Sequence, residues 1–142
     1  MTDNVKLLSS IIKTTHIAQI RIRCIIDTAV CSELRNILKI QLRKYNSIER
    51  EARSVANARG WEFEPVCTTA RVNVIIITKI QLLFWGIESR IAAMVIKAST
   101  EGIIKCIQNK HSLKQSDASV AILSEKLLDC ETANIEKLQG FL

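Results

Sequence analysis

Proline and glycine are scarce in this 142-residue chain, which has one proline, Pro65, and four glycines. Both residues are common where a chain turns, so their scarcity favours a few long elements over many short ones. Aromatic residues make up 4% of the chain, whereas hydrophobic residues make up 48%. This composition predicts an all-α protein packed through aliphatic side chains, and it disfavours a β-sandwich or barrel. The length is that of a single domain, residues 1–142.

Paired cysteine motifs are also missing. The five cysteines are an odd number, lie far apart and include no C-x-x-C pair, which argues against a disulfide framework and against a zinc knuckle. We expect them to be small buried thiols in a reducing cytosol. The residues are Cys24, Cys31, Cys67, Cys106 and Cys130.

Neither a targeting segment nor a membrane span is expected. Residues 1–16 have no uninterrupted apolar run and no small-residue cleavage site, so they do not resemble a signal peptide. Residues 72–87 are the best candidate for a span, but they include Asn73, Lys79 and Gln81. A spanning helix needs about 20 mostly apolar residues. We therefore predict a buried core helix here, no transmembrane segment, and a cytoplasmic location.

The first half of the chain is predicted to form two long helices, over about 3–30 and 32–59. In both, apolar residues recur at alternating steps of three and four, which keeps them on one side of a helix. Ser32 is the expected N-cap of the second helix, and Gly60 is the expected left-handed residue at its end. With almost no loop between them, the two helices should form an antiparallel hairpin.

Residues 61–66, WEFEPV, form the obvious connector, and Trp61 and Phe63 should fold back over the end of the helices. The following 67–110 segment would be roughly 65 Å long as one straight helix. We therefore predict a broken third element, about 67–84 and 88–110, with the break near Trp85 and a second weak point at 99–102. The apolar segment 88–107 is predicted to lie at the centre of the packing.

The last helix is predicted over about 117–139, capped by Ser116 or Asp117. Its apolar stripe contains one polar residue, Asn134, which we expect to form a hydrogen bond across the core. Together the predicted elements make an up-down four-helix bundle.

Catalytic and metal-binding motifs are not found in the sequence. A di-iron bundle takes Glu from two helices and Glu-x-x-His from two more, but His16 and His111 have Lys13 and Gln108 at that spacing. There is no glycine-rich phosphate loop, and no cysteine lies near a histidine in the sequence. We predict no catalytic residue, no metal, no cofactor and no enzymatic activity.

The net charge of +6 is concentrated in the first half of the chain. Residues 31–60 hold seven Lys or Arg against three Glu, and five of the cations fall within about 80° of a helical wheel, opposite the apolar stripe. We call these five residues the basic stripe. Such a stripe could bind nucleic acid or anionic lipid, but a solvated helix face has the same pattern. Its residues are Arg35, Lys39, Arg43, Arg50 and Arg53.

Three segments resemble a known group of proteins: NVKLLSSII near the start, and IAAMVIKASTEGIIKCI and SEKLLDCETANIEKLQGFL in the second half. They are similar to small uncharacterised bacterial proteins, mostly clostridial, that are classed as ferritin-like bundles of unknown function. The resemblance implies a ferritin-like four-helix bundle. Those proteins have a Ser-His-Ile-Ala-Glu-like run where this chain has Ser89-Arg90-Ile91-Ala92-Ala93, so the imidazole and carboxylate are both missing.

Three functions remain open from the sequence. The leading hypothesis is a non-enzymatic cytosolic bundle that associates with itself, as a homo-oligomer, or with a protein partner, because many apolar residues lie off the main stripes. The first alternative is a basic bundle that binds nucleic acid or an anionic membrane through the basic stripe. The second is a degenerate ferritin-like metal-binding protein. The off-stripe residues are Ile17, Ile20, Ile40, Ile75 and Val95.

Overall fold

The computed structural model of the chain describes residues 3–26, 28, 31–85 and 88–142. These residues form five α-helices and a short 3-10 helix, and no strand occurs among them. No helix in the described ranges is long and apolar enough to cross a membrane. The helices are α1 (Asp3–Ile26), α2 (Ser32–Arg59), α3 (Thr68–Trp85), α4 (Glu88–His111) and α5 (Ala118–Leu138), followed by the 3-10 helix η1 (Gln139–Phe141).

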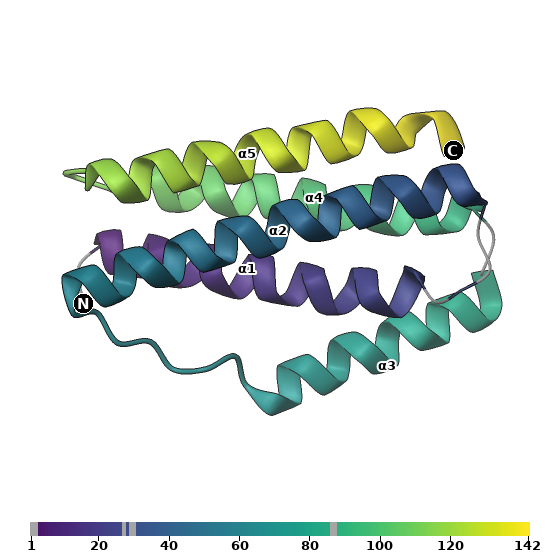
Figure 1. Ribbon diagram of the computed structural model, residues 1–142, viewed down its shortest axis with the longest axis horizontal. Coiled ribbons are helices and arrows are strands. Elements are labelled where there is room, and N and C mark those ends of the chain that lie inside the picture. The colour runs from purple at the N-terminus through teal and green to yellow at the C-terminus, as the bar shows by residue number, and fades with distance from the viewer. Residues whose placement is uncertain (1–2, 27, 29–30, 86–87) are drawn as a thin grey trace.

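Four of the helices, α1, α2, α4 and α5, lie side by side, while α3 lies outside them along α1 (Figure 1). α1 contacts each of the other four helices, and most extensively α2. The helix at the centre of the packing is therefore α1 and not the predicted 88–107 segment of α4. α4 packs mainly against α5.

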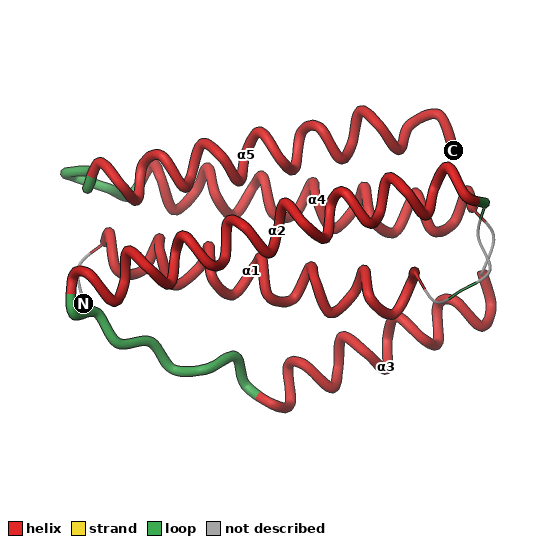
Figure 2. Tube along the Cα trace, viewed as in Figure 1, coloured by secondary structure: helices red, strands yellow, loops and turns green. Residues whose placement is uncertain are grey.

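The helix directions follow from contacts between helix ends. The backbone N–H of Cys31, just before α2, donates a 3.1 Å hydrogen bond to Glu88 at the start of α4. At the other end, Asn4 of α1 bonds to the backbone of Gln115 and of Asp117, just before α5. α2 and α4 therefore run in the same direction. α3, which comes between them in the sequence, runs in the opposite direction (Figure 2). The predicted single broken third element is instead two helices of opposite direction.

The core is built from one face each of α1, α2, α4 and α5. Leu8, Ile25, Leu34 and Leu38 are completely buried, and Leu127 is 2% exposed. Among the described residues, the stripes predicted for 3–30, 32–59 and 117–139 are thus confirmed as buried or partly buried. Trp61 and Phe63 pack against this core partly buried, as predicted.

The helix ends agree with the predictions in most places. Gly60 has φ of 67°, the left-handed conformation expected for it. Asp117 caps α5, and α4 runs without a break through 99–102. The N-cap of α2 is Cys31 and not Ser32, because the Cys31 Sγ accepts the N–H of Leu34. α1 ends at Ile26, and the rest of its predicted range, apart from Thr28 in a bend, lies outside the described residues.

The prediction of a buried core helix at 72–87 is wrong for the residues that the structure describes. Thr78 of α3 is buried, but Val72, Ile76, Ile80 and Leu83 are between 44% and 82% exposed. The physical reason is the position of α3. Because this helix lies outside the other four, they can cover only one of its faces. Gly86 and Ile87 lie outside the described residues.

Candidate functional site

The basic stripe does not form one continuous surface. Arg43 and Arg50 line a groove of about 700 Å³ together with Arg23 of α1. Arg53 instead pairs at 3.5 Å with Glu49, and Lys39 is exposed but does not line the groove. The fifth member, Arg35, is partly buried, and its Nε has no hydrogen-bond partner in the described part of the chain. The structure therefore brings two of the five predicted residues together.

Neither histidine lies in a recognisable catalytic or metal site. His16 Nδ1 lies 2.8 Å from Glu49 Oε1, which joins α1 to α2, and His111 is exposed at the end of α4. Among the described residues, no three or more His, Cys, Asp or Glu side chains are grouped so as to hold a metal ion. The metal-binding hypothesis gains no support from this part of the chain.

A buried polar cluster joins α2 to α5. The Tyr45 hydroxyl donates a hydrogen bond to Glu131 Oε1, and Asn134 Nδ2 donates a 2.9 Å hydrogen bond to the Tyr45 oxygen. All three side chains are at most 3% exposed. Asn134 was predicted to bond across the core, and it does. Glu131 was missed, although its spacing from Leu127 and Asn134 places it on the same stripe of α5.

Burial dominates the electrostatics of this cluster. It raises the pKa of Glu131 to about 7, and the hydrogen bond from Tyr45, the nearby Ser99 hydroxyl and the charge of Arg21 oppose the shift only in part. Burial, followed by the neighbouring Glu131, raises the pKa of Tyr45 well above its usual range. Glu131 can therefore gain or lose a proton near neutral pH.

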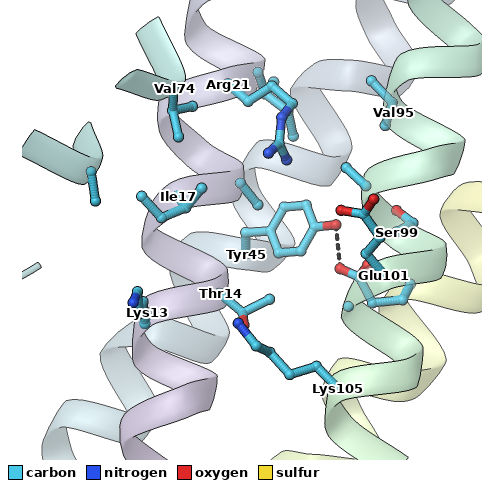
Figure 3. A pocket seen from close by; sticks show the side chains of 16 residues that line it. Lys13, Thr14, Ile17, Arg21, Tyr45, Val74, Val95, Ser99, Glu101 and Lys105 are labelled. Atoms are coloured by element: carbon cyan, nitrogen blue, oxygen red, sulfur yellow. Dashed lines mark hydrogen bonds between the residues drawn. The ribbon is translucent and has the colours of Figure 1, made fainter. Parts of the chain in front are cut away.

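Tyr45 and Glu131 of this cluster form the floor of a cavity of about 440 Å³, which is lined mainly by α1 and α4, with Ala70 and Val74 from α3 (Figure 3). Its apolar walls include Ile17 of α1, Val74 of α3 and Val95 of α4. Its charged side chains are Lys13 and Arg21 from α1, Glu101 and Lys105 from α4, and Glu131 from α5.

Two small residues of α4 make room for the floor of the cavity. A Cβ atom on Gly102 would lie 2.7 Å from Glu131 Oε2, so glycine is what allows the carboxyl group to lie against α4. Ser99 is 1% exposed, and its Oγ has no hydrogen-bond partner in the described part of the chain. The prediction of a weak point at 99–102 is wrong, because α4 continues through it, and Ser99, Glu101 and Gly102 of this segment line the cavity.

No protein family, curated protein or solved structure matches the chain. The resemblance to clostridial ferritin-like proteins accordingly stays a prediction from the segments that carry it.

Proposed function

We propose that the chain is a non-enzymatic cytosolic helical protein that associates with a second copy of itself through the outer face of α3. The observation that carries the proposal is the exposure of Val72, Ile76, Ile80 and Leu83. We call these four residues the α3 stripe. Exposed apolar side chains that are contiguous on one element commonly mark an interface, whereas scattered ones do not.

The α3 stripe is contiguous by its spacing. At 100° per residue its members fall within about 80° of arc, and Thr78, the buried residue of α3, points to the other side. The stripe extends over roughly 17 Å of helix axis. A helix that is apolar on two sides is stable in water when both sides are covered.

A second copy fits this surface because the α3 stripe is nearly symmetric along the helix: the pairs Val72/Leu83 and Ile76/Ile80 have midpoints that agree to within about half a residue. If two copies of α3 pack antiparallel across a two-fold axis, Val72 meets Leu83 of the other copy and Ile76 meets Ile80. Each contact then occurs twice, as a two-fold interface requires. The α3 sequence contains Arg71 and Lys79 but no acidic residue, and neither cation belongs to the stripe.

We also propose a topology for the helices. We take α1, α2, α4 and α5 as a ferritin-like four-helix bundle, with α3 as its long crossover connection. Support comes from the common direction of α2 and α4, since ferritin-like bundles have one such crossover. The predicted up-down order with short loops would place these two helices antiparallel.

The test is the mass in solution, measured by light scattering over a wide range of protein concentration. One helix face is smaller than the roughly 1,200–2,000 Å² of a standard interface, so we expect a dimer that dissociates on dilution. Ile80→Glu should give a monomer at all concentrations. Ile122→Glu is the matched control, because Ile122 on α5 is 57% exposed and Ile80 is 52% exposed. A wild-type monomer at high concentration would overturn the proposal.

A second candidate function rests on the groove that contains Arg23, Arg43 and Arg50. Arg43 and Arg50 form no salt bridge with any described residue, so both are available to phosphate groups of nucleic acid or lipid. Binding of a DNA duplex or of anionic vesicles should weaken steeply with salt. It should be lost in the Arg43→Glu/Arg50→Glu variant and largely kept in Lys39→Glu. Equal losses in the two variants would show that the groove has no special role.

A further inference from the structure

We propose that the cavity above Tyr45 and Glu131 is a binding site for a small amphipathic anion, a carboxylate or phosphate monoester with an apolar body. The volume of about 440 Å³ lies in the range of small-molecule sites, roughly 300–1,000 Å³. At roughly 30 Å³ per non-hydrogen atom, the share of a water molecule in the liquid, it holds about a dozen atoms or slightly more.

The lining carries three cationic side chains against the two carboxyl groups of Glu101 and Glu131, so its charge favours an anion. Lys13, Arg21 and Lys105 line the cavity and form no salt bridge within the described residues. Figure 3 shows Arg21 extending toward Tyr45 from one end of the cavity and Lys105 from the other. Burial lowers the pKa of Arg21, with Tyr45 and Glu101 among the charges that oppose this shift. An anion among these cations would compensate the desolvated guanidinium.

The buried polar groups of the floor add hydrogen bonds. Ser99 Oγ is buried, unpartnered in the described part of the chain, and part of the cavity lining. Its hydroxyl lies close enough to Tyr45 and Glu131 to lower the pKa of each, and it can turn to donate to an anionic oxygen instead. Glu131 Oε1 is occupied by Tyr45, while Oε2 lies against Gly102.

The apolar walls of the cavity favour a ligand that also has an apolar part. Ile17 and Ala18 on α1, Val74 on α3, and Val95 and Ala98 on α4 surround the charged groups. An inorganic ion would leave these walls in contact with water, whereas an alkyl chain covers them. The site therefore favours an anion with a short apolar tail over a bare phosphate or sulfate ion.

The test uses decanoate and octyl phosphate, titrated into the full chain by isothermal calorimetry below their micelle concentrations. At least one of them should bind with a 1:1 stoichiometry, and the tighter of the two identifies the head group. Decanol, of similar length but uncharged, should bind at least tenfold more weakly, and decylamine should not bind. The proposal fails if neither anion binds, or if decanol or decylamine binds as well as the anions do.

Two variants locate the binding site. Arg21→Gln should weaken the binding of the tighter-binding anion about tenfold or more, which is the usual effect of losing a charge-assisted hydrogen bond. Lys105→Gln changes an exposed side chain and should weaken the binding of the same anion several-fold. Lys114→Gln removes the same charge from an exposed loop outside the cavity and should have no effect. Equal effects at Lys105 and Lys114 would mean that net charge alone drives binding, and would overturn the assignment.

The pH dependence of binding gives an independent readout. An anion beside Glu131 favours the protonated carboxyl group, so affinity for decanoate should rise as the pH falls from 8 to 6. In Glu131→Gln, which cannot titrate, that dependence should vanish. A wild-type affinity that does not change with pH would exclude an anion next to Glu131. The charged or titratable groups that share the cavity are Lys13 and Arg21 from α1, Tyr45 from α2, and Glu101 and Lys105 from α4; α3 contributes Ala70 and Val74.

Discussion

Tyr45 on α2 donates its hydroxyl hydrogen to the carboxyl group of Glu131 on α5, and the two residues are 86 positions apart in the chain. Asn134, one turn further along α5, donates to the same hydroxyl oxygen at 2.9 Å. The phenol is therefore both donor and acceptor inside the core. Because each of these groups would be costly to bury alone, the cluster fixes how α2 and α5 lie against each other.

Replacing Tyr45 with Phe should destabilise the protein by about 1–3 kcal/mol, because the change leaves a buried carboxyl group and a buried amide without their partner. Urea denaturation monitored by circular dichroism measures the difference. The double variant Tyr45→Phe/Glu131→Gln is the control. If the two groups act together, its loss should be smaller than the sum of the two single losses. Additive losses would show that the hydrogen bond does not couple the residues.

The stability of the protein should fall as pH rises from about 4 to about 7. Burial raises the pKa of Glu131 to about 7, compared with about 4.3 for an exposed glutamate. In that interval the folded chain holds a proton that the unfolded chain releases, so each increase in pH favours unfolding. The total loss is roughly 3 kcal/mol, and it levels off above the folded-state pKa. Unfolding free energies measured across this range should become nearly constant in Glu131→Gln.

The sequence contains enough information to place α2 to within one residue at its start and to the residue at its end. Its apolar residues repeat with helical spacing from Leu34 to Ala56, and Gly60 ends the helix in the left-handed conformation. These signals are local, so no knowledge of the tertiary structure is needed. The same reasoning narrowed the cap of α5 to Ser116 or Asp117, and Asp117 is the cap, because its carboxylate accepts the free N–H groups at the helix start.

The exposure of α3 could not be predicted in the same way. A periodic apolar stripe shows that a segment is helical, but not whether another part of the molecule covers that stripe. Ile76, Ile80 and Leu83 therefore looked like core residues and are exposed. The cavity could not be predicted for a similar reason. Arg21, Tyr45 and Glu131 come from three helices, and no local pattern in the sequence links them.

Asp117 should matter more to stability than its partner Arg59. Asp117 Oδ1 accepts the N–H groups of Ser119 and Val120, and Oδ2 accepts a 2.8 Å hydrogen bond from Arg59 at the end of α2. Asp117→Ala removes the cap and the ion pair, at a cost of about 1–2 kcal/mol from the cap alone. Arg59→Gln, which keeps the cap, should cost less. Thermal unfolding of the two variants tests this order, and the reverse order would contradict it.

The same aspartate should affect stability in strong acid. The hydrogen bond from Arg59, more than the backbone N–H groups, lowers the pKa of Asp117 to about 2. Its contribution is therefore complete above about pH 4 and is lost as the pH falls toward 2. This range lies below the one in which Glu131 titrates, so the two effects can be separated in one pH series. In Asp117→Asn, the unfolding free energy should change less between about pH 4 and pH 2 than in the wild type, while its change between about pH 4 and pH 7 should stay the same.

Cys67 should be the most reactive thiol at neutral pH. It is exposed just before α3, where the backbone N–H groups of Ala70 and Thr69 lower the pKa of its thiol. Burial raises the pKa of Cys106, and raises that of Cys130 to about 11. Because the thiolate is the nucleophile, iodoacetamide should label Cys67 first and label the two buried thiols only after denaturation. Peptide mass spectrometry follows the sites, and Cys67→Ser, but not Cys24→Ser, should remove the fast phase.

Gln41 should be a position where a polar residue can be replaced with a gain in stability. It is 1% exposed on α2, and neither Oε1 nor Nε2 has a hydrogen-bond partner in the described part of the chain. Methionine has a similar shape and no strongly polar group, so Gln41→Met should stabilise the protein by about 1–3 kcal/mol. Gln19 is the matched control, because it is also buried but bonds to Thr15 and Asn46 at 3.1 Å. Gln19→Met should therefore destabilise by a similar amount in the same urea titration. A loss of stability in both variants would mean that Gln41 is satisfied by a bound water molecule, since a water with polar partners is costly to displace.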